Sequence, residues 1–269
     1  MTDGSQDGKK PAQESTGRKE KRMTLIIKNV TKQFEHAQEP TLADINLEIA
    51  DGEFLCVVGK SGCGKSTLLN LIAGLETPTG GEILLNGKAV TGPGADRVVM
   101  FQEHALFPWR NVIENVKFGM EVAGVPKSQQ EERALHYLRM VQMEAYRDYP
   151  IHQLSGGMRQ RVALARALTL DTEILLMDEP FSALDKQTAN RMRRELQEIW
   201  MKMNRTVFFI THSVEEAVYL ADRVVVLSEK EKSIRDVIRI DLPRPRHVYD
   251  DVFVEYRHRI LEEVQDGEE

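Results

Sequence analysis

The stretch Gly59-Lys60-Ser61-Gly62-Cys63-Gly64-Lys65-Ser66-Thr67 decides the fold of this chain. It fits the pattern G-x-x-x-x-G-K-[ST], in which glycines let the backbone wrap a phosphate chain with its N–H groups pointing inward. The apolar run Phe54–Val58 before it is typical of a buried strand, and Ser66–Ala73 has the apolar spacing of a helix that Gly74 ends. The N-terminus of that helix would favour an anion. A plain glycine-rich turn is the alternative, and it would not require this strand and this helix.

Several other short apolar runs are typical of buried parallel strands. They are Val98–Phe101, Ile174–Met177, Val207–Ile210 and Val224–Leu227. The segments Met23–Val30 and Leu42–Ile49 instead alternate apolar and polar residues, as half-buried strands do. An apolar helical stripe is expected to pack against the sheet. It consists of Met192, Leu196, Ile199, Trp200 and Met203. The pattern predicts an α/β fold.

Residues 103–170 differ from their surroundings because they contain no clear strand pattern. They predict several helices, including Gln130–Val141 and Gly156–Leu168, and therefore a separate helical subdomain inserted into the β/α alternation. Residues 1–22 carry almost no large apolar side chain, so we expect a disordered tail. The main domain is expected over 23–246, and 247–269 should form a short C-terminal helical extension.

Composition limits the class of protein. The 269 residues carry a net charge of -6, with 41% hydrophobic and 29% charged residues, which suits one large domain or two small ones. No apolar run approaches the roughly 20 residues that cross a bilayer. The polar stretch Met1–Arg22 is no signal peptide, and Cys56 and Cys63 cannot make a disulfide framework. We expect a soluble protein of a reducing, cytosolic setting, and the acidic balance argues against general nucleic-acid binding.

Two carboxylates follow the apolar run Ile174–Met177, namely Asp178 and Glu179. A parallel strand would deliver them to the same edge of the sheet as the phosphate loop. Asp178 can then orient Mg²⁺ through water, and Glu179 can polarise an attacking water as a general base. His212 follows Val207–Ile210 and should reach the same edge, where we expect it to contact a γ-phosphate. A purely structural histidine is the alternative.

A second element suited to phosphate begins at Leu154-Ser155-Gly156-Gly157-Met158-Arg159-Gln160. Ser155 is a good helix N-cap, and the two glycines would let a phosphate approach the helix end. A chain with a complete phosphate loop does not need a second such site for itself. We therefore expect this element to serve the ATP of a partner chain.

These motifs together resemble the ATP-binding subunit of an ABC transporter. Gly59–Thr67 matches the Walker A motif of that family, Ile174–Glu179 its Walker B motif, and Leu154–Gln160 its signature motif. Gln102 matches the Q-loop, Ser182-Ala183-Leu184-Asp185 the D-loop, and His212 the switch histidine, so the resemblance covers roughly residues 23–246. It implies a P-loop NTPase (RecA-like) core with an antiparallel β edge sheet and an inserted helical subdomain.

The resemblance also implies the site residues. ATP would be held by Gly59, Lys60, Ser61, Gly62, Cys63, Gly64, Lys65, Ser66 and Thr67 of one chain and, in trans, by Ser155, Gly156, Gly157 and Asp185 of another. Mg²⁺ would be held by Ser66, Gln102 and, through water, Asp178, while Glu179, His212, Lys65 and Gln102 would be catalytic. The family has an aromatic residue that stacks on adenine where this chain has Phe34, although Phe34 could instead belong to the core.

The resemblance further implies the assembly, a head-to-tail homodimer that sandwiches two ATP molecules. Within the family, three segments and the signature Leu154–Met158 are similar to importers of the nitrate/sulfonate/taurine group. The three segments are Gly92–Arg97, Leu106–Trp109 and Asp241–Arg246. Phe107, Pro108 and Trp109 form an apolar knot, where we expect a cytoplasmic helix of an integral membrane permease subunit to dock. Local packing of the helical subdomain is the alternative for this knot.

The function predicted from the sequence is therefore an ATPase subunit that energises an ABC importer for an anion such as nitrate, a sulfonate or taurine. It would lie peripherally on the cytoplasmic face of the cell membrane and act indirectly with a periplasmic or extracellular substrate-binding protein. The chain ends soon after Arg246, so no built-in regulatory domain is expected. A soluble ABC ATPase acting on nucleic acid or the ribosome is an alternative. A nucleotide kinase or GTPase would share the phosphate loop but would not need Leu154–Gln160.

Overall fold

The chain folds around two β-sheets, as seen in a computed structural model that describes residues 23–101, 105–170, 172–182, 184–203 and 205–265. Over these residues, a four-stranded antiparallel sheet has the order β2-β1-β4-β5, and a six-stranded sheet has the order β10-β9-β3-β8-β7-β6. The strands are β1 (Met23–Lys32), β2 (Leu42–Ala50), β3 (Phe54–Val58), β4 (Gly80–Leu85), β5 (Lys88–Ala89), β6 (Arg97–Met100), β7 (Ile174–Asp178), β8 (Thr206–Ile210), β9 (Arg223–Leu227) and β10 (Ile234–Arg239). The expected α/β core with an antiparallel edge sheet is confirmed.

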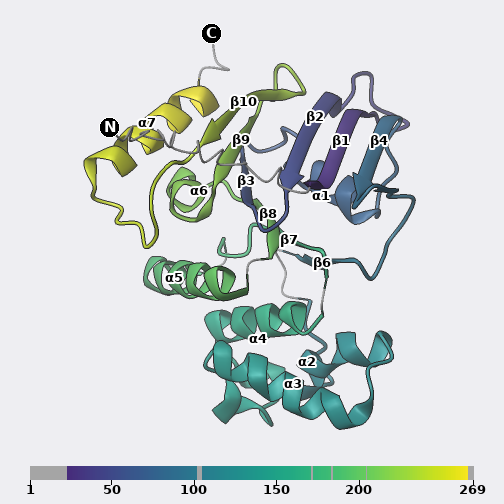
Figure 1. Cartoon of the computed structure of the whole chain (residues 1–269), viewed down its shortest axis with the longest axis vertical. Coiled ribbons are helices and arrows are strands. Elements are labelled where there is room, and N and C mark those ends of the chain that lie inside the picture. Colours follow the sequence, from purple (N-terminus) through teal and green to yellow (C-terminus); the bar gives the residue numbers. More distant parts are fainter. Residues whose placement is uncertain (1–22, 102–104, 171, 183, 204, 266–269) are drawn as a thin grey trace, which may run out of the picture.

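Helices lie around the larger sheet (Figure 1). The α-helices are α1 (Lys65–Ala73), α2 (Val112–Val122), α3 (Lys127–Met140), α4 (Gly156–Leu168), α5 (Lys186–Met203), α6 (Val214–Leu220) and α7 (Asp251–Gln265), with short 3₁₀ helices η1 (Glu144–Tyr146) and η2 (Ile151–Gln153). Figure 1 shows α2, α3 and α4 gathered at the lower end of the molecule, away from the antiparallel sheet at the upper right. The described residues between β6 and β7 contain helices but no strand. None of the described helices has both the length and the apolar character needed to cross a membrane.

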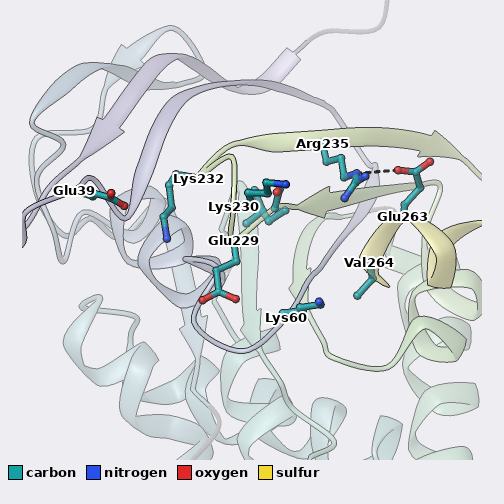
Figure 2. Close-up of a pocket in the computed structure, with 10 residues that line it drawn as sticks. Glu39, Lys60, Glu229, Lys230, Lys232, Arg235, Glu263 and Val264 are labelled. Carbon is teal, nitrogen blue, oxygen red and sulfur yellow. Dashed lines mark ion pairs between the residues drawn. The ribbon is translucent and has the colours of Figure 1, made fainter. Parts of the chain in front are cut away.

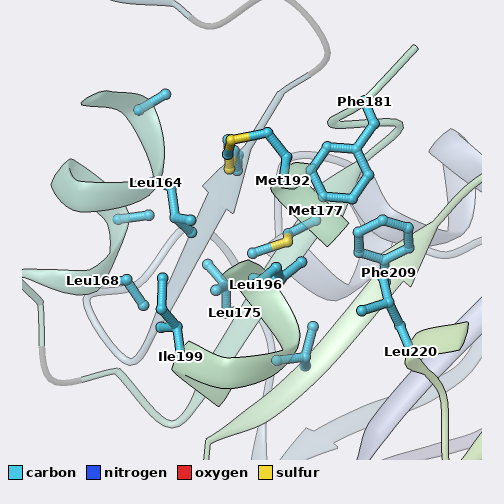
Figure 3. Close-up of a cluster of buried hydrophobic side chains, with 14 of the residues drawn as sticks. Leu164, Leu168, Leu175, Met177, Phe181, Met192, Leu196, Ile199, Phe209 and Leu220 are labelled. Atoms are coloured by element: carbon cyan, nitrogen blue, oxygen red, sulfur yellow. The ribbon is translucent and has the colours of Figure 1, made fainter. Parts of the chain in front are cut away.

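The larger sheet is buried because its central strands are apolar on both faces. All five residues of β3 are buried, and β3 pairs in parallel with β8 and β9. Phe54, Cys56 and Val58 pack into a core with the helices α4, α5 and α6, whereas Leu55 and Val57 pack into another core with α1 and the antiparallel sheet. Figure 3 shows the first core between α4, α5 and strand β7. The sheet thus separates two apolar layers, which fixes its position in the molecule.

The apolar stripe of α5 packs against this first core, as predicted. Met192, Leu196 and Ile199 are buried, and Trp200 and Met203 are partly buried against the same cluster. Figure 3 shows Met192 and Leu196 beside Met177 of β7. Burial of side chains on one face of α5 therefore fixes this helix against the sheet.

Some elements differ from the expectations. Strand β4 and helix α6 had no predicted counterpart, because β4 begins with Gly80-Gly81 and α6 has only seven residues. Residue Phe101 was expected in a strand, but β6 ends at Met100 and Phe101 is 43% exposed. A short helix and a glycine-led strand carry too little periodic pattern to be recognised in a sequence. Residues 1–22 and part of 247–269 lie outside the described residues.

Arginine side chains of the segment after β10 hold the C-terminal end of α6. Arg246 is 4% exposed and donates hydrogen bonds to the carbonyl oxygens of Val218, Tyr219 and Ala221 at distances of 2.6, 3.3 and 2.7 Å. Burial lowers the pKa of Arg246 to about 10, so the guanidinium still carries its charge at pH 7. These bonds satisfy carbonyl groups that a helix end leaves without a partner in the helix.

The first prediction concerns this contact. Arg246→Ala should lower the free energy of unfolding by roughly 2–4 kcal/mol, because it removes a buried side chain and leaves several carbonyl groups without a donor. Urea denaturation of the purified chain measures the change. Arg239→Ala is the control, since that side chain is 77% exposed in its ion pair with Asp241 and should change stability by less than about 0.5 kcal/mol. Equal stability of Arg246→Ala and the parent would contradict the prediction.

Candidate functional site

The phosphate loop joins β3 to α1 and depends on glycine at two positions. Gly59 has a φ of +156°, and a Cβ there would lie 2.6 Å from the carbonyl oxygen of Leu227. Gly64 has a φ of +100°, and a Cβ there would lie 2.6 Å from Cδ2 of Leu42. A side chain at either position would collide with a neighbour, so the loop can pass this closely only with glycine.

Lys65, the first residue of α1, turns its side chain back into the loop. Its Nζ donates to the carbonyl oxygens of Gly59 and Lys60, each at 2.8 Å, and the residue is only 7% exposed. Cys63 Sγ lies 3.9 Å from the same Nζ, and burial raises the pKa of this thiol, so Cys63 contributes no negative charge. The ammonium group is thereby held at the centre of the loop.

Two oxygen ligands suited to Mg²⁺ lie side by side at the end of β7. Ser66 Oγ is 3.4 Å from Asp178 Oδ1. Burial raises the pKa of Asp178, with a smaller rise from the charge of Glu179, while the Ser66 hydrogen bond and the Lys65 charge act in the opposite direction. The described residues contain no group of three or more His, Cys, Asp and Glu side chains that could hold a metal. Mg²⁺ commonly takes one or two protein oxygens and completes its shell with phosphates and water, so this pair fits it.

Glu179 and His212 meet at the same edge of the sheet. Nδ1 of His212 lies 3.2 Å from Oε2 of Glu179, and the His212 side chain is 64% exposed. Glu179 has a φ of +43°, and its N–H donates to the carbonyl oxygen of Ile210 at 3.0 Å. A non-glycine residue in this conformation carries backbone strain, which is common at functional sites. The pair joins the ends of β7 and β8.

The signature element lies at the start of α4. Ser155 caps the helix, with its Oγ accepting from the N–H of Met158 at 3.3 Å. A Cβ on Gly157 would lie only 2.7 Å from Cγ2 of Thr188 in α5, so glycine lets these two helices approach closely without a shift of the Thr188 side chain. Asp185 accepts from the N–H of Thr188 at 3.0 Å, and hydrogen bonds from Thr188 lower the pKa of Asp185. The residues predicted to act in trans therefore lie together at the starts of α4 and α5. Figure 1 shows α4 well separated from α1, the helix that follows the phosphate loop.

The structure places the remaining predicted residues in different environments. Phe34 is 41% exposed, with Lys32 Nζ 4.8 Å from its ring centre, so it lies outside the core. Phe107 packs its ring 4.4 Å from that of Phe118 and is half-buried, whereas Trp109 is 77% exposed beside it. Local packing therefore holds for Phe107, and Trp109 is left as an exposed aromatic surface. Gln102 lies outside the described residues.

The surroundings of His212 were not predicted. Thr211 and Glu216 are joined by a hydrogen bond of 2.6 Å between Oγ1 and Oε2. The available signal was Ser213-Val214-Glu215-Glu216, which fits the S-x-x-E pattern of a helix start. Because no helix was predicted at 214–220, this pattern was not recognised as a helix start.

A pocket of about 380 Å³ adjoins the phosphate loop at Lys60 (Figure 2). It lies between the turn joining β9 to β10 and the end of α7, where Arg235 pairs with Glu263 at 3.2 Å. Its other charged residues are of both signs, namely Glu39, Glu229, Lys230 and Lys232. The pocket borders the loop but includes none of Lys65, Asp178, Glu179 and His212.

Comparison with known proteins gives a consistent result. The family model described as "ABC transporter" matches residues 42–182. An uncharacterized ABC transporter ATP-binding protein of Methanocaldococcus jannaschii is 53% identical over 247 residues, covering 91% of this chain and 92% of the relative. The taurine import ATP-binding protein of Pseudomonas putida is 43% identical over 248 residues, covering 89% and 95%. The nitrate import ATP-binding protein of Synechocystis sp. is 50% identical over 223 residues, covering 82% and 84%.

A solved structure agrees with these relatives. A dimeric ATP-binding cassette in a post-hydrolysis state, bound to ADP and Pi, superposes with a TM-score of 0.71 at 30% identity. The match covers 81% of this chain and all of the cassette. With the family model matching more than half of its length, the chain belongs to the ABC transporter family as an ATP-binding protein.

Proposed function

We propose that this chain is the ATP-hydrolysing subunit of an ABC importer for an anion of the nitrate, sulfonate or taurine kind. The observation that carries the proposal is the convergence of Lys65, the Ser66–Asp178 pair and the Glu179–His212 pair at one edge of the sheet. The names of the taurine and nitrate import relatives support the importer and its class of substrate.

The phosphate loop binds the phosphates of ATP. Its backbone N–H groups, from Gly59 to Thr67, and the ammonium of Lys65 hold the β- and γ-phosphates. Lys65 exchanges the loop carbonyls it now contacts for phosphate oxygens, which form stronger, charge-assisted hydrogen bonds. Phe34, which is exposed beside Lys32, stacks on adenine. Ser66, Gln102 and, through water, Asp178 hold Mg²⁺, which supplies positive charge to the transferring phosphoryl group.

Hydrolysis uses the residues at the ends of β7 and β8. Glu179 accepts a proton from the attacking water as general base. His212 contacts the γ-phosphate, and its ring lies 3.2 Å from the carboxylate that must receive the proton. Gln102 completes the catalytic group. The backbone hydrogen bond from Glu179 to Ile210 favours this role, because catalysis of phosphoryl transfer depends mainly on positioning and charge.

Each ATP site is completed by a second copy of the chain. Ser155, Gly156, Gly157 and Asp185 of one copy face the phosphate loop of the other in a head-to-tail homodimer. Within one chain, Ser155, Gly156 and Gly157 stand at the start of α4 in the lower part of the molecule, whereas α1, which follows the phosphate loop, lies beside the antiparallel sheet (Figure 1). The dimeric form of the related cassette supports this assembly.

The exposed surface at Phe107, Pro108 and Trp109 docks a cytoplasmic helix of the permease subunits. The chain lies peripherally on the cytoplasmic face of the cell membrane, and a periplasmic or extracellular substrate-binding protein delivers the anion to the permease. Trp109 is the main contact, because 77% of it is exposed, whereas Phe107 is anchored against Phe118. Large, exposed aromatic residues of this kind are frequent at the centre of protein interfaces.

The second prediction tests the two-chain site. Glu179→Gln keeps the size of the side chain but cannot accept a proton, so ATP turnover should fall by about 10²–10⁴-fold while ATP binding persists. The variant should therefore be a monomer without nucleotide and a long-lived dimer with ATP, as measured by light scattering. Turnover at the parent rate would place the base elsewhere.

A double variant supplies the control for dimer formation. Adding Ser155→Arg to Glu179→Gln should abolish the ATP-dependent dimer, because a bulky cation would occupy the space of the partner's γ-phosphate. Arg239→Ala in the same background should leave the dimer intact, since this exposed side chain lies outside the proposed site. Persistence of the dimer in the Ser155→Arg double variant would exclude the trans role of the signature.

The third prediction concerns docking. Trp109→Ala should weaken co-purification with the permease by roughly 30-fold or more in affinity, as expected for an interface tryptophan worth about 2 kcal/mol. ATP affinity and unfolding temperature of the isolated chain should stay unchanged, because the side chain is exposed. Tyr249→Ala is the matched control, an aromatic residue that is 91% exposed elsewhere on the molecule. Equal permease affinity of both variants would argue against docking at Trp109.

A further inference from the structure

The backbone on either side of His212 is held by a single hydroxyl group. Oγ1 of Thr211 donates to Oε2 of Glu216 at 2.6 Å and accepts from the N–H of Ser213 at 3.0 Å. Thr211 is 1% exposed, so this hydroxyl cannot exchange its partners freely with water. His212 lies between Thr211 and Ser213 in the chain. Its side chain is exposed and contacts Glu179.

The same segment is tied to the elements that carry the rest of the site. The N–H of Thr211 donates to the carbonyl oxygen of Val57 in β3, the strand that leads into the phosphate loop, at 3.2 Å. Oγ of Ser213 accepts from the N–H of Glu216 at 3.3 Å and so caps α6. The position of His212 relative to the phosphate loop is therefore fixed from both β3 and α6.

The arrangement differs from an ordinary capping box. In a capping box, the third helical residue returns its side chain to the N–H of the cap residue, which would fix residues 213–216 alone. Here the Thr211 hydroxyl lies between Ser213 and Glu216, because it accepts a hydrogen bond from the Ser213 N–H and donates one to the Glu216 carboxylate. The interposed hydroxyl extends the contact to the residue before His212, so both neighbours of the histidine are held.

Burying the Glu216 carboxylate costs hydration free energy, which is unfavourable if the contact is purely structural. Burial raises the pKa of its carboxyl group, and the hydrogen bond from Thr211 is the largest opposing effect. A half-buried carboxylate loses hydration that one hydroxyl donor replaces only in part. Structural attachment of α6 is already provided by its neighbour Glu215, whose Oε1 pairs with Nη2 of Arg193 in α5 at 2.9 Å.

We propose that Glu216 is a positioning residue for ATP hydrolysis, which acts through the Thr211 hydroxyl to hold His212 toward Glu179 and the γ-phosphate. The inference rests on the proposed function of His212. Glu216 touches neither nucleotide nor water in this role. It restricts the backbone at 211–213, so that the imidazole does not have to be ordered anew in each catalytic cycle.

The experiment compares steady-state ATP hydrolysis by the full chain in its transporter complex. Glu216→Met keeps the length of the side chain but removes the acceptor, and kcat should fall by about 10- to 100-fold with the KM for ATP nearly unchanged. Glu216→Gln retains an acceptor oxygen for Thr211 and should restore most of the activity. Glu215→Met is the matched control on the same turn of α6, and it should keep kcat near that of the parent even though it removes the Arg193 ion pair.

Thr211 provides an independent pair of variants. Thr211→Val has the same shape without the hydroxyl and should reproduce the loss in kcat, whereas Thr211→Ser keeps the hydroxyl and should retain activity. This comparison remains decisive if Glu216→Met does not fold, which thermal unfolding of each variant reveals. Equal kcat of Thr211→Val and Thr211→Ser would overturn the proposal.

A double variant separates positioning from general damage. In a His212→Ala background, Glu216→Met should reduce kcat no further, because the residue that it positions is gone. A reduction as large as in the parent background would overturn the proposal, and so would equal kcat of Glu216→Met and Glu215→Met. A parent complex without ATPase activity would instead contradict the proposed function, so the two failures are distinguishable.

Discussion

The parallel register of β3, β8 and β7 is the constraint on which the site depends. Val57 pairs with Ile210, and Ile210 pairs in turn with Asp178, so the three strands end at one level. Parallel strands deliver their carboxyl ends to a common edge, and each of these ends carries a different group of the proposed site. A shift of one residue would turn Asp178 toward the opposite face of the sheet and separate it from Ser66, 3.4 Å away. The apolar layers on both faces of the sheet hold the register in place.

The sequence was most informative where the chemistry leaves little choice of residue. The glycines of the loop at Gly59 and Gly64 are required by collisions that any Cβ would cause, and the strand β3 was predicted at its observed bounds. The contacts of Thr211 and Glu216 could not be predicted in the same way, because they depend on the short helix α6 and on how closely it approaches the end of β8. This is a tertiary contact, and the periodicity of apolar residues in the sequence does not predict it.

The apolar knot at Phe107–Trp109 illustrates a second limit of the sequence. From the sequence alone, Phe107 and Trp109 have the same two possible roles: an exposed surface or part of the local core. In the structure Asn115, which is fully buried, accepts the N–H of Phe107 at 2.8 Å through its side chain and turns that residue toward Phe118. Trp109, two residues later, is left outside. The buried amide of Asn115 thus helps to hold Phe107 inward, and this contact becomes visible only in the folded chain.

The residues at the start of α4 and those just before α5 are held together, because the two helices are in contact at Gly157 and Thr188. A Cβ on Gly157 would approach Cγ2 of Thr188 to 2.7 Å, and Thr188 also donates its N–H to Asp185. Glycine at this position thus allows the two helix starts to approach closely, in addition to any space that it leaves for a phosphate. Ser155 and Asp185 cap the two helices at this junction, so a partner nucleotide would meet both side chains on one preformed surface. Preorganisation of this kind would lower the conformational entropy that formation of the proposed dimer must overcome.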